Sequence, residues 1–134
     1  MKTKNLFTVI LLMFAVGFAS CGQKNTDIVG IRWKLIEWNS EDVSEKGVWF
    51  ILHTKPNEVS GYGGCNWFQG KYKIKSGNRF NFSRGIQTLK HCDADIFQIC
   101  PVSILVIADN YTIKDDTLLV YQAGVRLAHF VVVQ

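Results

Sequence analysis

Groups that could perform chemistry are most concentrated around one cysteine near the middle of the chain. His91 precedes Cys92, and Asp93 and Asp95 follow, so imidazole, thiol and carboxylate groups lie within a few positions of one another. This set could bind zinc, or it could supply a cysteine nucleophile with a base. Both interpretations depend on where the neighbouring elements place these side chains.

The spacing argues against both kinds of site. A structural zinc site usually needs about four ligands, and the sequence has no C-x-x-C or H-x-x-x-H pattern, because His53, His91 and His129 are scattered. Adjacent residues on a strand point to opposite faces, so His91 is poorly placed to act as the base for Cys92. We therefore expect no catalytic residue, no metal, no cofactor and no enzymatic activity. His129 alternates with Leu127 and Val131, which predicts a histidine facing the core.

A second set of charged residues falls on one predicted strand. Lys71, Lys73 and Lys75 alternate and so share a strand face, with Arg79 following after a turn. The four could meet an anionic surface such as phospholipid headgroups or lipopolysaccharide. Lysines on a solvated face also discourage edge-to-edge pairing of strands, and we favour that simpler interpretation.

The N-terminus reads as a targeting segment. Lys2 and Lys4 precede an apolar run from Leu6 to Phe18. That run is shorter than the roughly 20 residues of a membrane-spanning helix, and it matches the core of a secretory signal. It ends in Phe18-Ala19-Ser20-Cys21, which is similar to the bacterial lipobox. The resemblance implies cleavage before Cys21, acylation of Cys21, and an anchor whose several acyl chains hold the protein in a lipid bilayer.

The chain therefore divides into three parts. We expect residues 1–20 to be a signal peptide of lipoprotein type, residues 21–29 a polar tether, and residues 30–134 one domain. The predicted location is the bacterial cell envelope, facing the periplasm from the outer membrane. The formal charge of +4 includes Lys2 and Lys4, which leave with the signal. A weakly charged exported domain is not expected to bind nucleic acid.

Period-2 alternation dominates the domain and predicts short strands. Ile31, Trp33 and Leu35 alternate with Arg32 and Lys34, and turn signals separate the later segments. The expected strands are 31–35, 48–52, 71–75, 79–82, 111–113, 118–121 and 125–133, and a turn is expected at 55–58.

One segment, from Asp93 to Ala108, lacks this alternation. Phe97, Cys100, Ile104 and Ile107 recur at helical spacing, and Pro101 is tolerated only in a first turn. The pattern predicts one helix that begins near Cys100 or bends there. The expected fold class is α+β: mostly antiparallel strands forming a strongly curled sheet or small barrel, with one helix packed against it.

Residues 59–72 read Val-Ser-Gly-Tyr-Gly-Gly-Cys-Asn-Trp-Phe-Gln-Gly-Lys-Tyr. This segment resembles the G-x-x-G-C-N-x-F-x-G-x-Y signature of the META domain family, the HslJ-type heat-shock lipoproteins. Further segments resemble the family pattern in order: Trp33 to Leu35, Thr88 to Cys92, Tyr111 to Leu119, and Gly124 to Phe130. Pro101 and Cys100 depart from that pattern. The resemblance implies a β-rich envelope domain linked to stress tolerance, and no catalytic set accompanies it.

The signature positions are interpreted as structural. Gly61, Gly64 and Gly70 would allow a sharp corner or bulge, and Asn66 could bond to its own backbone and hold that corner. Trp67, Phe68 and Tyr72 would anchor the corner to the core. Thr88 is also counted among the signature positions, because it matches the threonine of the family segment that Thr88 to Cys92 resembles.

The family pattern also bears on the cysteines. Cys65 and Cys92 occupy its two cysteine positions, which implies a disulfide between them, with Cys92–Cys100 as the alternative. Closing the loop between Cys65 and Cys92 contributes about 3.5 kcal/mol to the stability of the folded state, because it lowers the chain entropy of the unfolded state.

Two functions follow as hypotheses. The first is a non-enzymatic envelope lipoprotein that supports stress tolerance or envelope maintenance through a protein partner. The second is a carrier of a small apolar ligand, held in a cavity of the curled sheet. Its lining would come from the aromatic residues Trp33, Trp38, Trp49, Trp67, Phe80 and Phe82.

Overall fold

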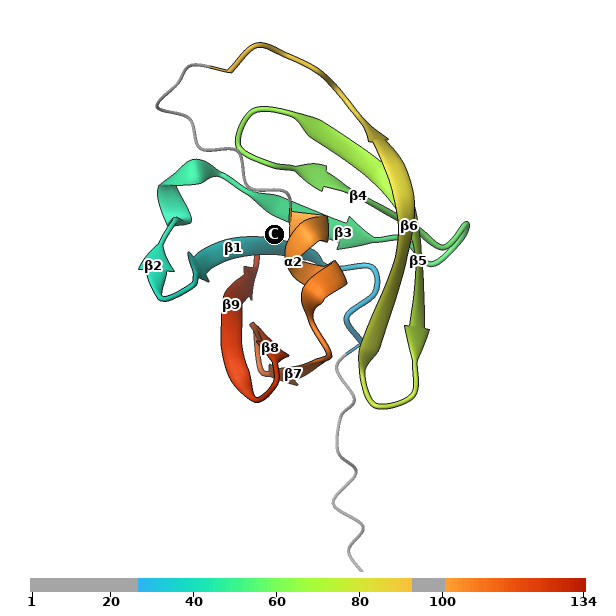
Figure 1. Cartoon of the computed structure of the whole chain (residues 1–134), viewed down its shortest axis with the longest axis vertical. Helices are drawn as coiled ribbons and strands as arrows, with labels where there is room; N and C mark the ends of the chain where they lie inside the picture. Colours follow the sequence, from blue (N-terminus) through green and yellow to red (C-terminus); the bar gives the residue numbers. More distant parts are fainter. Residues whose placement is uncertain (1–26, 93–100) are drawn as a thin grey trace, which may run out of the picture.

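A computed structural model describes residues 27–92 and 101–134 of the chain (Figure 1). The predicted signal peptide, Cys21, most of the tether and the segment 93–100, which includes Cys100, lie outside the described residues. Within the described ranges, no helix is both long enough and apolar enough to cross a bilayer.

In the part of the chain that the structure describes, nine antiparallel strands form one sheet that curls almost into a barrel, with one α-helix packed against it (Figure 1). This confirms the predicted fold class. The sheet order is β6-β5-β4-β3-β1-β9-β8-β7, and β2 pairs with β1 off this path. The strands are β1 (Arg32–Trp38), β2 (Glu41–Asp42), β3 (Trp49–Leu52), β4 (Glu58–Tyr62), β5 (Trp67–Lys75), β6 (Arg79–Gln87), β7 (Asn110–Lys114), β8 (Thr117–Gln122) and β9 (Val125–Val132). A short 3-10 turn, η1 (Ser44–Lys46), and the helix α2 (Pro101–Ile107) complete the described elements.

The helix and one strand show how context decides local structure. Helix α2 is described from Pro101 to Ile107, within the segment that the sequence predicts to be helical. Strand β4 was not predicted, because it contains Ser60 and Gly61 and its strand propensity is low. It forms because β3 and β5 pair with it on both sides, so two ladders of backbone hydrogen bonds hold it.

Alternate side chains of the strands point inward and fill the curl. Trp33, Phe50 and Phe130 are fully buried, and the Phe50 and Phe130 rings meet edge to face with centroids 5.2 Å apart. The core begins at Ile28, two residues before the expected domain boundary, and the Trp33 indole N–H donates to the Ile28 carbonyl over 3.0 Å. In residues 27–92 and 101–134, the buried core residues fall between Ile28 and Phe130 and form one cluster, so the domain is expected to fold without residues 1–26.

His129 does not face the core, so that prediction was wrong. The buried residues of β9 are Ala128 and Phe130, whereas His129 is only partly buried. Alternation divides the side chains of β9 into two sets on opposite faces of the strand, and the two sets are equally apolar. The neighbouring strands decide between them, because Phe130 pairs with the buried residues Leu35 and Leu118.

The two ends of the sheet order, β6 and β7, approach each other without a ladder between them. The Phe80 and Tyr111 rings stack across this seam with centroids 4.7 Å apart. The Asn78 side-chain amide also donates to the Tyr111 carbonyl over 3.1 Å. Helix α2 lies against β6 on the inner side of the sheet (Figure 1). Side chains therefore close the barrel where backbone pairing stops.

The seam predicts a loss of stability in alkali. Burial, with a smaller contribution from the Asp27 charge, raises the pKa of Tyr111 above its ordinary value of 10.0. The folded state thus favours the neutral phenol. This stabilisation is complete below the unfolded pKa and is lost as the pH rises through the folded pKa. Between about pH 9 and about pH 11 we expect the free energy of unfolding in urea to fall less in a Tyr111→Phe variant than in the parent. Parallel losses in the two proteins would contradict this account.

Candidate functional site

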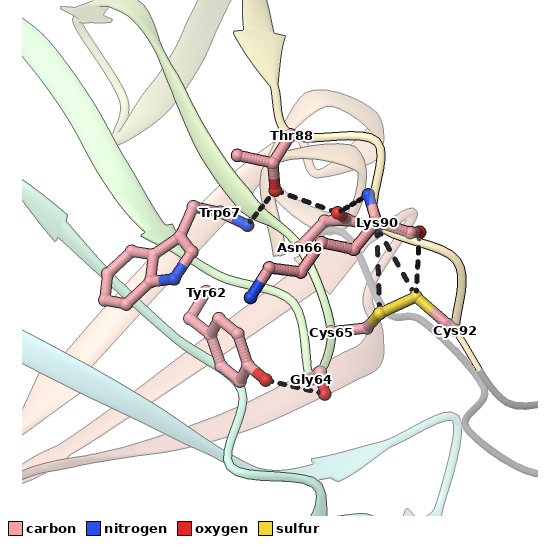
Figure 2. Close-up of a disulfide and its surroundings, with 8 residues drawn as sticks. All are labelled: Tyr62, Gly64, Cys65, Asn66, Trp67, Thr88, Lys90 and Cys92. Carbon is pink, nitrogen blue, oxygen red and sulfur yellow. Dashed lines mark hydrogen bonds between the residues drawn. A yellow bond between two sulfur atoms is a disulfide. The ribbon is translucent and has the colours of Figure 1, made fainter.

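A disulfide joins the turn between β4 and β5 to the segment after β6 (Figure 2). Cys65 and Cys92 are bonded, with their Cα atoms 6.1 Å apart and 27 positions between them in sequence. The pairing implied by the family pattern is therefore confirmed. The cross-link encloses strands β5 and β6, so it fixes where this hairpin begins and ends.

Asn66 lies at the centre of this corner and is the one buried polar residue among the described residues, with 5% of its surface exposed. Its Oδ1 accepts from the Thr88 hydroxyl and from the Lys90 backbone N–H, both over 2.8 Å. Its Nδ2 donates to the Lys90 carbonyl and to the Cys92 sulfur, both over 3.5 Å. The sequence predicted a bond to the residue's own backbone. These bonds instead reach across 22 to 26 positions and tie the turn to the chain after β6.

Thr88 extends the same network. Its hydroxyl donates to Asn66 and accepts from the Trp67 backbone N–H over 3.1 Å. Its own N–H donates to the Trp67 carbonyl over 3.0 Å. One threonine therefore continues the β5–β6 pairing for a step beyond the strand and connects it to Asn66 (Figure 2).

The remaining signature residues shape the corner. Of the four glycines in this segment, only Gly64 has a left-handed φ, of 90°, and its carbonyl accepts from the Tyr62 hydroxyl. A side chain at Gly61 would collide with the Trp49 carbonyl and the Phe68 ring, so glycine is needed there for close approach. Gly70 lies at a register shift in β5.

The two inward aromatic residues of the signature, Phe68 and Tyr72, are buried as predicted. The Tyr72 hydroxyl donates a hydrogen bond to the His53 carbonyl over 2.9 Å.

Trp67 is not an anchor in the core, so that prediction was wrong. Half of its surface is exposed, because parity along β5 places Phe68 and Tyr72 inward and Trp67 outward. Its ring meets Trp49 edge to face at 5.5 Å and lies 5.3 Å from Tyr62. The Arg32 guanidinium sits 4.5 Å from the centre of the Trp49 ring, in cation–π contact.

The six aromatic residues expected to line a ligand cavity do not share one. Trp33 and Phe80 belong to the buried core, and Trp38 and Phe82 pack against it. Trp49 and Trp67 lie on the outer face. The hollow nearest the corner measures about 100 Å³ and lies between the β5–β6 pair and Val102 of α2. A second, open hollow is polar and is lined by Ser76, Gly77, Arg79, Asp109 and Asn110.

The structure also brings together a histidine and a serine that the sequence analysis did not connect. The His53 Nε2 and Ser60 Oγ atoms lie 2.7 Å apart on the outer face of β3 and β4. The hairpin register pairs Leu52 with Val59, so His53 and Ser60 are diagonal neighbours, and a correct prediction of β4 would have found them. Such a pair could in principle activate a serine hydroxyl. Strand β4 pairs on both sides, however, so its backbone N–H groups are already engaged in ladders.

No three His, Cys, Asp or Glu side chains in residues 27–92 and 101–134 gather closely enough to hold a metal ion. His91 is exposed beside the disulfide, and Asp93 and Asp95 lie outside the described residues. Because Cys92 is bonded to Cys65, its sulfur is not a free thiolate in this state.

A comparison with family models matches residues 26–133 to the META domain. The chain belongs to the META domain family. The match covers the disulfide, the Asn66 network and every described strand. Searches of curated proteins and of solved structures found no match.

The Thr88 network can be tested by a near-isosteric substitution. Thr88→Val should lower the free energy of unfolding by about 2 kcal/mol, because the Trp67 N–H and Asn66 lose a hydrogen-bond partner. Thr112→Val on the exposed face of β7 is the matched control and should change stability by less than about 0.5 kcal/mol. Urea denaturation of both variants gives the comparison. Equal effects would mean that the Thr88 hydroxyl does not stabilise the corner.

Proposed function

We propose that this META domain protein is a lipid-anchored lipoprotein of the bacterial cell envelope. In this proposal it acts without catalysis, through a protein partner, in stress tolerance or envelope maintenance. The observation that carries the proposal is the order of features along the chain. A signal-like segment ends at Cys21, and the META match begins at residue 26. So short a connection would hold the domain close to the bilayer, facing the periplasm from the outer membrane.

The fold supports a binding role over a catalytic one. The Asn66 network, the disulfide and the packed core stabilise a rigid scaffold, and the signature residues act within it as structural parts. The His53–Ser60 pair lies on the outer face of a fully paired strand, where no backbone N–H is directed at a reacting atom. A reaction through this pair would therefore lack the stabilisation that most acyl-transfer sites provide.

The alternative of an apolar ligand carrier has less support. Trp33, Phe50 and Leu52 fill the interior, with no measurable exposure. A saturable change in tryptophan fluorescence with a panel of apolar ligands would nevertheless favour the carrier.

The anchor is tested by cell fractionation. A Cys21→Ser variant should move from the membrane fraction to the soluble fraction, because it loses the site of acylation. Cys100→Ser is the control, since it removes another cysteine and should leave the protein with the membranes. Mass spectrometry of the parent should find fatty acyl groups on Cys21. A Cys21→Ser protein that fractionates like the parent would refute the anchor.

A further inference from the structure

Basic residues are concentrated on one face of the sheet. Residues 27–134 contain twelve Lys and Arg and eleven Asp and Glu, so this part of the chain is almost neutral. Strand alternation and register place six of the twelve on the outer face of β1, β3, β4, β5 and β6. The acidic residues on the outer face of these strands are Glu58, and Glu37 near the end of β1, which is ion-paired with Arg126. We call this surface the basic face. Its basic residues are Arg32, Lys34, Lys71, Lys73, Lys75 and Arg79.

The strongest charge lies on the β5–β6 hairpin. Lys71, Lys73 and Lys75 are all exposed, and Arg79 pairs with Lys75 across the hairpin. Among the described residues the only ion pair joins Arg126 to Glu37. Glu58 lies opposite Lys71 in the β4–β5 ladder, whereas Lys73 and Lys75 face Asn81 and Arg79 across the hairpin. Four like charges on one hairpin repel each other, and an anionic partner would relieve that repulsion.

Apolar side chains lie on the same face, towards the other end of the hairpin. Trp67 is 50% exposed and Ile86 is 75% exposed. Ile86 pairs with Gln69, two residues along β5 from Trp67, so both side chains project to the same side. Exposed tryptophan and aliphatic side chains beside lysines are the composition that favours the interface of a bilayer, where rings sit at headgroup level.

The chain also enters the domain beside this hairpin. Asp27 lies close enough to Tyr72, an inward residue of β5, for its charge to raise the pKa of that phenol after the larger effect of burial. Asp27 follows Cys21 by six positions, and such a segment spans at most about 20 Å. An acyl chain on Cys21 would thus keep Asp27, at the entrance to the domain, within about that distance of the lipid surface.

We infer that the basic face rests on the surface of an anionic lipid bilayer. In this arrangement Lys71, Lys73, Lys75 and Arg79 contact phosphate headgroups, while Trp67 and Ile86 enter the interface. The inference rests on the proposed envelope location, and it adds an orientation that the anchor alone would not give.

The test uses residues 27–134, which contain every core residue that the structure describes and lack Cys21, so its result does not depend on acylation. This fragment should sediment with phosphatidylcholine vesicles that contain about 30% phosphatidylglycerol, and not with vesicles of phosphatidylcholine alone. About 0.5 M NaCl should release the fragment from the vesicles, because salt screens the electrostatic attraction.

Tryptophan fluorescence tests whether Trp67 enters the interface. Emission should shift to shorter wavelength when the fragment binds vesicles, and a Trp67→Ala variant should lose most of that shift.

Two double variants locate the contact. Lys73→Gln with Lys75→Gln should weaken the vesicle partition coefficient by about thirtyfold. Lys46→Gln with Lys114→Gln removes the same charge from η1 and from the end of β7, neither of which contributes to the six residues of the basic face, and should leave most of the binding intact. Circular dichroism checks that both variants fold. Equal losses in the two variants, absence of binding to the anionic vesicles, or binding to a polyanion such as heparin without binding to vesicles would each overturn the inference.

Discussion

The buried amide of Asn66 is the constraint on which the rest of this domain depends. A buried amide must find partners for its donors and its acceptor, because an unpaired group there costs about 1–3 kcal/mol. Asn66 finds them in Thr88, Lys90 and Cys92, which arrive from the far side of the β5–β6 hairpin. The turn before β5 and the segment after β6 must therefore meet, and the disulfide joins them covalently at the same place. The position of the hairpin, and with it one edge of the curled sheet, follows from this meeting.

The same constraint determines what the molecule presents to its surroundings. Fixing the start of β5 sets the parity of the whole strand, with Phe68 and Tyr72 inward and Trp67 and the lysines outward. A tryptophan that is half exposed and whose backbone is held at both its N–H and its carbonyl is a preorganised contact, and it loses little freedom on binding. The corner that stabilises the fold thus also builds the face that we assign to the bilayer.

Much of this could be predicted from sequence, and the failures have physical causes. Alternation around Trp33 and Leu35 identified β1 and its buried side, and the META signature identified the disulfide. Alternation alone could not choose between the two apolar sets of β9, so His129 was placed inward when pairing with Leu35 and Leu118 requires Phe130 there. Strand β4 has little propensity of its own and exists through its neighbours. The partners of Asn66 are more than twenty positions away, and no local pattern records such distances.

The central claim is most directly tested by amide hydrogen exchange at Lys90. This residue is exposed and lies outside every strand, and its N–H donates to the Asn66 side chain. The account predicts that its amide exchanges at least about a hundredfold more slowly than an unstructured amide, and that Asn66→Ala abolishes this protection while core amides stay protected. Exchange of the Lys90 amide at nearly the unstructured rate in the parent protein would contradict the account, because the corner would then not be held by Asn66.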